Sequence, residues 1–193
     1  MNILVLHAHP VETSFSAALL RIVVERLAAE GHSVDACDLY AEGFDPRMSR
    51  TERLGYHDAP ANIENVRGYV ERLRKAEALV LVFPVWNYGY PAILNGFFDR
   101  VFLPGVSFEL VDGEVRPSLH HIRKIAAVTT YGGSRLQAML IGDPPRRLVK
   151  RVLRATVKPG APVSYLAHYS MNISTERSRE KFMAKVAAAM GTF

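Results

Sequence analysis

Residues 79–103 read Leu-Val-Leu-Val-Phe-Pro-Val-Trp-Asn-Tyr-Gly-Tyr-Pro-Ala-Ile-Leu-Asn-Gly-Phe-Phe-Asp-Arg-Val-Phe-Leu. The unbroken apolar run from Leu79 to Phe83 is typical of a strand that is buried on both faces of a parallel sheet. Pro84 has no N–H group to donate, so we expect the strand to end there. Pro91 stands at a first-turn position that proline tolerates in a helix. The stretch therefore predicts a strand, an aromatic loop and a helix.

The helix predicted after this loop carries apolar residues at helical spacing: Leu94, Phe97, Phe98, Val101 and Phe102. Phe97 and Phe98 point about 100° apart, so we expect one to pack on the sheet and the other to lie near the edge of the helix. The loop lies at the carboxyl end of a strand, where open α/β sheets bind ligands. Its flat aromatic side chains and free backbone N–H groups suit a flat ring with a polar edge.

The rest of the chain alternates between apolar runs and amphipathic segments. We predict further strands at 2–6, 34–39, 124–131 and 163–169, helices at 13–31, 62–75, 143–155 and after 174, a hairpin at 108–116, and a loop with one short helical piece at 41–61. This alternation predicts one α/β domain over residues 1–193 with a doubly wound, five-stranded parallel sheet and helices on both faces. We expect the strand order 2-1-3-4-5, because it gathers the loops that follow the first, third and fourth strands.

Composition narrows the classes of protein that fit. The chain has 193 residues, of which 49% are hydrophobic, and no apolar run approaches the ~20 residues that cross a membrane. The start of the chain lacks a basic leader, so we expect no signal peptide. Cys37 is the single cysteine, which excludes an internal disulfide and favours a cytoplasmic location. The net charge of +5 comes from scattered residues with one cluster at 146–154, so we expect neither nucleic-acid binding nor membrane insertion.

The first candidate ligand loop precedes the helix at 13–31. His9, Ser14, Phe15 and Ser16 lie at its N-terminal end, where free N–H groups and hydroxyls attract phosphate. Simple helix capping by Thr13 or Ser14 is the alternative. The sequence has no Walker-A motif and no G-x-G-x-x-G motif, which disfavours a P-loop NTPase or a Rossmann dehydrogenase.

The pair His7 and His9 also raises the possibility of a metal site, because alternate residues of a strand point the same way. Asp38 follows a neighbouring predicted strand and would be a third ligand. We expect no metal, and a metal-dependent hydrolase that uses His7 and His9 remains an alternative.

Two further loops contain groups that suit a planar ligand. Pro84, Val85, Trp86, Asn87 and Tyr88 would line its ring, and a cluster of aromatic residues that only fills the core is the alternative. After the fourth predicted strand, glycines let the backbone approach a ligand closely, and N–H groups there would stabilise negative charge. A plain turn is the alternative for this third loop, whose candidate residues are Thr129, Thr130, Tyr131, Gly132 and Gly133.

Three blocks of the sequence resemble the flavin-dependent NAD(P)H:quinone reductases, which are flavodoxin-like enzymes of the DT-diaphorase type, and especially their shorter bacterial relatives. The blocks are Leu-His-Ala-His-Pro-Val-Glu-Thr-Ser-Phe-Ser at 6–16, Phe-Pro-Val-Trp-Asn-Tyr-Gly-Tyr-Pro-Ala-Ile-Leu-Asn-Gly-Phe-Phe-Asp-Arg-Val-Phe at 83–102, and Thr-Thr-Tyr-Gly-Gly-Ser at 129–134. The second block is the most specific, and the resemblance covers about residues 2–170. It implies a flavodoxin-like fold.

The resemblance also implies an activity and a site. In the family the first block binds the cofactor phosphate, the second the isoalloxazine and the third its pyrimidine side. The implied cofactor is FAD, with FMN possible, and the electron donor is NADPH or NADH. The implied reaction is two-electron, ping-pong reduction of a quinone or a related acceptor. Members are homodimers with flavin sites at the subunit interface, so we expect a homodimer whose pocket is completed by the other chain, with the 41–61 segment as the candidate contributor.

The sequence departs from the family pattern after the third block. The long eukaryotic members carry a tyrosine and a histidine there that relay charge, whereas Ile141 occupies the approximate histidine position and no tyrosine follows Gly133 in the loop. We therefore take Tyr131, Gly132 and Gly133 as the candidate catalytic residues.

Two other functions compete with the quinone reductase. Some short relatives are cytosolic regulatory subunits of glutathione-gated potassium efflux systems, and the sequence is compatible with such a role. A one-electron carrier like flavodoxin fits less well, because such carriers are acidic and this chain carries a net charge of +5.

Overall fold

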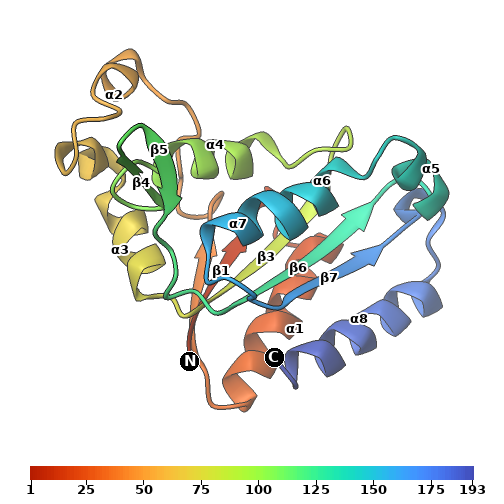
Figure 1. Cartoon of the computed structure of the whole chain (residues 1–193). Helices are drawn as coiled ribbons and strands as arrows, with labels where there is room; N and C mark the ends of the chain where they lie inside the picture. Colours follow the sequence, from red (N-terminus) through yellow and green to blue (C-terminus); the bar gives the residue numbers. More distant parts are fainter.

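Five parallel strands form the central sheet in the order β2-β1-β3-β6-β7, as Figure 1 shows. They are β1 (Asn2–His7), β2 (Ser33–Asp38), β3 (Ala78–Val85), β6 (Lys124–Tyr131) and β7 (Val163–His168). The computed structural model describes residues 1–193. The central strand β3 is buried along its whole length, as its unbroken apolar run predicts. The predicted order 2-1-3-4-5 is confirmed, because β6 and β7 are the fourth and fifth strands of the sheet.

Two helices cover one face of the sheet, α1 (Phe15–Ala29) and the C-terminal α8 (Glu176–Met190). Their packing follows the predicted apolar stripes, since the buried residues include Leu19, Val23 and Leu27 of α1 and Phe182 and Val186 of α8. Thr175 caps α8 by accepting a hydrogen bond from the N–H of Ser178.

The opposite face is covered by three helical segments. They are α3 (Arg67–Lys75), which the 3₁₀-helix η1 (Ala61–Val66) precedes, then α4 (Ala92–Val101), and finally α6 (Pro144–Arg147), which runs through the π-helix η2 (Leu148–Leu153) into α7 (Arg154–Thr156). The side chain of Phe97 is fully buried and that of Phe98 partly buried, as their 100° separation on a helix predicts. None of the helices is both long and apolar enough to cross a membrane.

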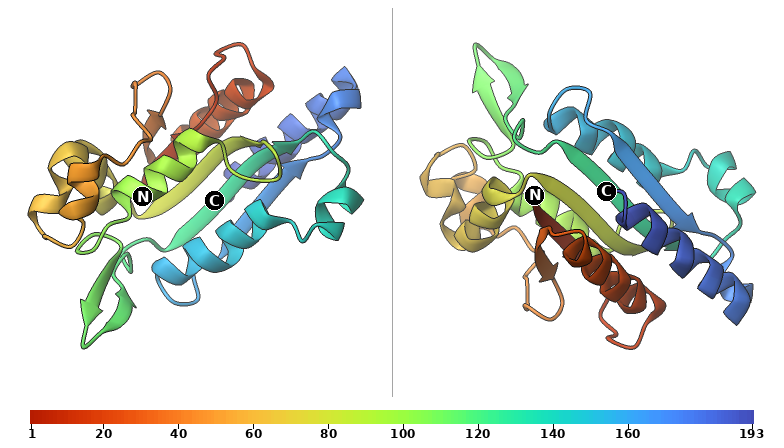
Figure 2. Two further views of the ribbon diagram at one scale, coloured as in Figure 1. Left: turned by 90° about the horizontal axis from the view of Figure 1, so that it is seen from above. Right: turned by 90° about the horizontal axis from the view of Figure 1, so that it is seen from below.

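Shorter elements connect these layers: α2 (Arg50–Leu54), the hairpin of β4 (Phe108–Val111) and β5 (Glu114–Pro117), α5 (Arg135–Leu140) and the 3₁₀-helix η3 (Met171–Ile173). Asp112 and Gly113 both have positive φ, which confirms the predicted hairpin turn. Figure 2 shows the hairpin projecting from the body of the molecule. Helix α5 was not predicted, because most of its apolar side chains are exposed and it has no buried stripe.

The predicted end of β3 at Pro84 is wrong, because β3 continues to Val85 and Pro84 pairs with Thr130 of β6. The N–H of Ala8 donates to the carbonyl of Val82 at 3.1 Å, so the backbone of Val82 faces β1. Backbone groups alternate sides along a strand, so Pro84 also faces that side. Strand β1 has already ended at His7, and the missing N–H therefore costs no ladder bond.

The 41–61 segment is held against α4 of the same chain. Arg100 of α4 is buried and donates to the carboxylate of Glu52 (Nε to Oε1, 3.0 Å) and to the backbone carbonyl of Asp45. Gly96 of α4 faces Pro46 so closely that no Cβ would fit between them. The segment that looks irregular in sequence is thus fixed by tertiary contacts.

Candidate functional site

The three candidate loops meet at the carboxyl edge of the sheet, after β1, β3 and β6. The rings of His9 in the first loop and Trp86 in the second lie 5.8 Å apart between centroids. A Cβ added to Gly133 in the third loop would lie 2.9 Å from the hydroxyl of Tyr88 in the second. The structure thus brings the predicted loops together, as the strand order requires.

The first loop presents the N-terminus of α1 to this edge. The side chain of Ser14 accepts a hydrogen bond from the N–H of Ala17 at 3.1 Å, so Ser14 is the helix cap. The N–H groups of Phe15 and Ser16 precede the first intrahelical hydrogen bond and have no backbone acceptor. Together with the helix dipole they form a site that suits a phosphate.

The hydroxyl of Ser16 points into the protein. Nδ1 of the buried His7 donates to Oδ2 of Asp38 at 2.9 Å, and Nε2 of His7 lies 3.4 Å from Oγ of Ser16. The hydroxyl of Ser16 thus has a contact inside the protein, and its role at a phosphate site stays a prediction. The backbone N–H of Ser16 is the group that lacks a backbone acceptor.

The metal alternative finds no ligand set in the structure. No group of three or more His, Cys, Asp or Glu side chains lies close enough to hold a metal ion. Nδ1 of His9 accepts a hydrogen bond from the N–H of Val11 at 3.0 Å. Partial burial lowers the pKa of His9 below its ordinary value, so its imidazole is neutral at pH 7 and would contact a ligand by hydrogen bonding.

The second loop is a tight reversal of the chain. Trp86 and Gly89 exchange backbone hydrogen bonds of 3.3 and 2.9 Å, and Asn87 and Tyr88 between them both have positive φ, at 49° and 55°. Two positive φ values define a type I′ turn. Asparagine adopts this conformation readily, whereas tyrosine does so rarely, and such strain gathers at ligand sites.

The turn leaves Trp86 with 42% of its surface exposed, although Pro84 and Val85 are buried. The core-filling alternative therefore describes only part of the loop. It applies to Tyr90, whose ring contacts Phe83 at 4.8 Å between centroids. Trp86, Asn87 and Tyr88 remain at the surface or partly exposed, where a planar ligand could reach them.

The third loop combines buried strand residues with accessible glycines. Thr129 and Thr130 are buried at the end of β6, and Oγ1 of Thr129 has no hydrogen-bond partner. Gly132 is exposed, and a Cβ there would lie 3.3 Å from the side-chain amide of Asn172. The missing side chains at Gly132 and Gly133 leave room for Asn172 and Tyr88, and the exposed backbone of Gly132 is where a ligand could approach this loop.

Tyr131 lies in a buried polar network behind this loop. Its hydroxyl donates to Oδ1 of Asp143 at 2.6 Å and lies 2.6 Å from the hydroxyl of Tyr165. Arg146 donates to Oδ2 of Asp143 at 2.7 Å and to the hydroxyl of Tyr169 at 2.8 Å. Burial, followed by the interaction with Tyr165 and the hydrogen bond to Asp143, raises the pKa of Tyr131 far above its ordinary value.

The network leaves no free hydroxyl on Tyr131. With its side chain 1% exposed and its hydroxyl engaged, the geometry favours a positioning role that fixes the start of the third loop. Its catalytic role stays a prediction. Asp143 precedes two prolines, which marks a helix start in the sequence but does not identify it as the partner of Tyr131. The sequence carries no signal for Asn172.

These features fit a flavin. The N–H groups at α1 suit a phosphate, the turn at Trp86 to Tyr88 suits the face of a planar ring, and the unpartnered Oγ1 of Thr129 lies at the base of the glycine loop. A groove of about 350 Å³ lies elsewhere, between α4, η2 and the start of the hairpin.

Comparison with known proteins gives one family and several relatives. The model of one protein family, whose description is flavodoxin-like fold, matches residues 1–157. NAD(P)H dehydrogenase [quinone] 1 of Cavia porcellus is 30% identical over 152 residues, which cover 70% of this chain and 55% of the relative. Ribosyldihydronicotinamide dehydrogenase [quinone] of Mus musculus is 30% identical over 128 residues, covering 56% and 54%. The chain thus spans about half the length of these curated relatives.

Solved structures share the fold over the full chain. A protein from Streptococcus mutans superposes with a TM-score of 0.85 at 29% identity, and the match covers 100% of both chains. An NAD(P)H:quinone oxidoreductase from Methanothermobacter marburgensis superposes with a TM-score of 0.83 at 24% identity over 99% and 98% of the two chains. At 24% identity, the similarity to the second structure shows a shared fold only.

Proposed function

Since the chain belongs to the family of proteins with a flavodoxin-like fold, we propose that it is a flavin-dependent NAD(P)H:quinone oxidoreductase. The observation that supports this most is the meeting of three loops at one sheet edge: the free N–H groups before α1, the exposed aromatic turn after β3 and the glycines after β6. The names of the curated relatives point to the same activity. Its cytoplasmic location remains a prediction.

The residues would divide the binding of the flavin between them. The N–H groups of Phe15 and Ser16 hold the phosphate, with the neutral His9 beside them. Trp86 and Tyr88 contact the ring, and the backbone of Gly132 and Gly133 faces its pyrimidine side, where N–H groups stabilise negative charge. The flavin supplies the hydride chemistry when bound. FAD is the proposed form, with FMN possible.

The absorption spectrum of the purified protein, followed by mass analysis of the released cofactor, tests this function. We expect flavin absorption bands and the mass of FAD or FMN. A colourless protein that takes up neither flavin on incubation would refute the proposal.

The kinetics should be ping-pong, because one pocket would admit the donor and then the quinone. Initial rates measured against NADPH or NADH at several fixed quinone concentrations are expected to give parallel double-reciprocal lines. Intersecting lines would show a ternary complex and contradict the shared pocket.

We also propose that the active form is a homodimer. The groove between α4, η2 and the hairpin is lined by Phe98, Phe102 and Phe108, and the buried hydroxyl of Tyr90 beside it has no partner. An apolar surface of this kind commonly marks a partner site, and twofold contacts are the commonest solution. Phe108 is the one residue of the hairpin that lines the groove. Because the 41–61 segment already packs on α4 of its own chain, we place the dimer interface at this groove.

Analytical ultracentrifugation at micromolar protein tests the dimer. The expected mass is twice 21.5 kDa. Val152→Asp in the groove should shift the protein toward monomer, because a charge would be buried at the dimer interface. Leu54→Asp is the matched control, since Leu54 on α2 is similarly exposed, at 68% against 59% for Val152, and lies outside the groove. A wild-type protein that is monomeric with flavin bound and active would refute the dimer.

A further inference from the structure

A second cavity lies beside the glycine loop, between α5 and α6. Its volume is about 340 Å³, and we call it the arginine cleft. Its lining includes Arg135, Gly142, Asp143, Arg146, Arg147 and Tyr169. Three arginines and one aspartate line the cleft, so its charge is positive.

Only one of these arginines has its charge balanced. Arg146 pairs with Asp143 (Nε to Oδ2, 2.7 Å) and stacks over the ring of Tyr165 at 4.4 Å from its centroid. Arg135 and Arg147 take part in none of the eight salt bridges of the structure. Two positive charges are therefore free to meet an anion.

The side chain of Arg147 packs against the backbone of the cleft at Gly142. Gly142 has a φ of +88°, and a Cβ there would lie 3.4 Å from the guanidinium carbon and nitrogens of Arg147. The guanidinium group thus lies close to the bare backbone of Gly142, and its planar fork of donors suits bidentate binding of an oxyanion.

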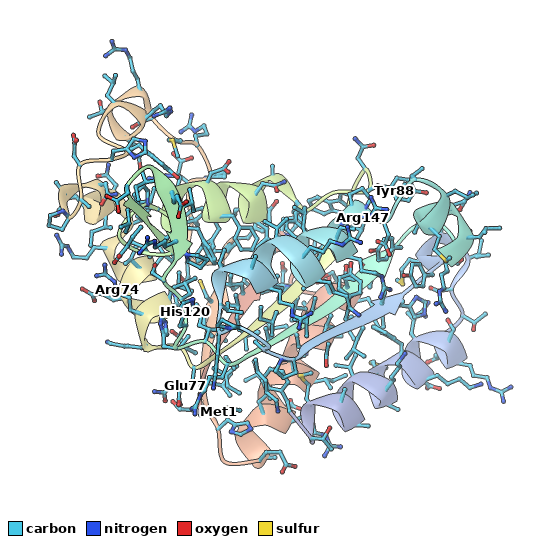
Figure 3. The ribbon with its side chains drawn as sticks, in the orientation of Figure 1. Met1, Arg74, Glu77, Tyr88, His120 and Arg147 are labelled. Carbon is cyan, nitrogen blue, oxygen red and sulfur yellow. The ribbon has the colours of Figure 1, made fainter.

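The cleft adjoins the proposed flavin site through the third loop. Arg135 follows Gly133 by two residues, and the carbonyl of Gly133 accepts a hydrogen bond from the N–H of Ser170, the neighbour of Tyr169, at 2.8 Å. Figure 3 shows Arg147 and Tyr88 at the same end of the molecule. A substrate over the aromatic turn would therefore have the arginine cleft next to it.

We infer that Arg135 and Arg147 form a subsite for an oxyanion that a substrate carries into the flavin site. The oxyanion comes either from a phosphate of the nucleotide donor or from an acidic substituent of the acceptor. The identity of the substrate rests on the proposed oxidoreductase function, whereas anion binding in the cleft does not. Each arginine–oxyanion contact is expected to change affinity about tenfold.

The first test measures binding without turnover. Calorimetric titration of the flavin-loaded protein with inorganic pyrophosphate at fixed ionic strength should show saturable binding. The double variant Arg135→Gln with Arg147→Gln should weaken it at least tenfold. Arg151→Gln removes an exposed arginine of η2 that does not line the cleft, and it should leave binding unchanged. No binding by the wild type, or equal weakening in Arg151→Gln, would overturn the inference.

The second test identifies the source of the oxyanion. The double variant should raise KM about a hundredfold for one class of substrate. A rise for NADPH alone would identify the 2′-phosphate, and a rise for both nucleotides would identify the diphosphate. A rise for a sulfonated naphthoquinone but not for the unsubstituted one would identify the acceptor. An unchanged KM for all four substrates would overturn the substrate subsite even if pyrophosphate binding were lost. A flavin-loaded protein that binds pyrophosphate but oxidises neither nucleotide would instead refute the proposed function and leave the cleft as an anion site.

Discussion

Replacing Gly96 with alanine is expected to lower the free energy of unfolding by about 3 kcal/mol, the upper part of the usual range for overpacking. Gly96 lies in α4, and the added Cβ would overlap the carbonyl oxygen and Cβ of Pro46 and lie 2.5 Å from its Cα. These are backbone and ring atoms that cannot move aside as a flexible side chain would. The 41–61 segment would have to shift, and the buried bonds of Arg100 to Glu52 and Asp45 would shift with it.

Guanidinium unfolding of the two apoproteins measures this difference. Gly68→Ala is the matched control, because Gly68 is also a helix glycine, in α3, but has no atom within 4 Å of its added Cβ. Alanine favours a helix over glycine by about 1 kcal/mol, so this variant should be as stable as the wild type or more so. Equal stability of Gly96→Ala and Gly68→Ala would contradict the close contact between α4 and the 41–61 segment.

Replacing Ser16 with aspartate is expected to weaken flavin binding at least a hundredfold, or by about 3 kcal/mol. The side chain at position 16 points toward His7 in the first turn of α1, so the new carboxylate would lie behind the N–H groups that hold the proposed phosphate. Two negative charges a few ångströms apart repel each other strongly in a poorly solvated site.

Fluorescence titration of each apoprotein with FAD and with FMN measures the effect. Ser16→Ala is the matched control, because it removes only a hydroxyl that points toward His7 at 3.4 Å and leaves the backbone N–H in place. We expect its flavin affinity to fall less than tenfold. Unchanged flavin affinity in folded Ser16→Asp would remove this loop from the site.

The sequence by itself determined the sheet and the gathering of the loops. The runs at 2–6 and 79–83 are too apolar to face water on either side, so they had to be central parallel strands. Alternation with amphipathic helices then restricted the topology. The helix cap at Ser14 and the hairpin turn at Asp112 were predictable as well, because each depends on neighbouring residues alone.

Only the tertiary structure decided how the site residues are used. The hydroxyl of Ser16 in α1 contacts His7 of β1, which in turn contacts Asp38 of β2. The hydroxyl of Tyr131 contacts Asp143 and Tyr165, which come from other segments of the chain. Pro84 stays in the sheet because β1 ends before it. Periodicity and caps report on neighbours in sequence, whereas these outcomes depend on which polar groups meet after the chain has packed, and a buried polar group takes whichever partner the packing supplies.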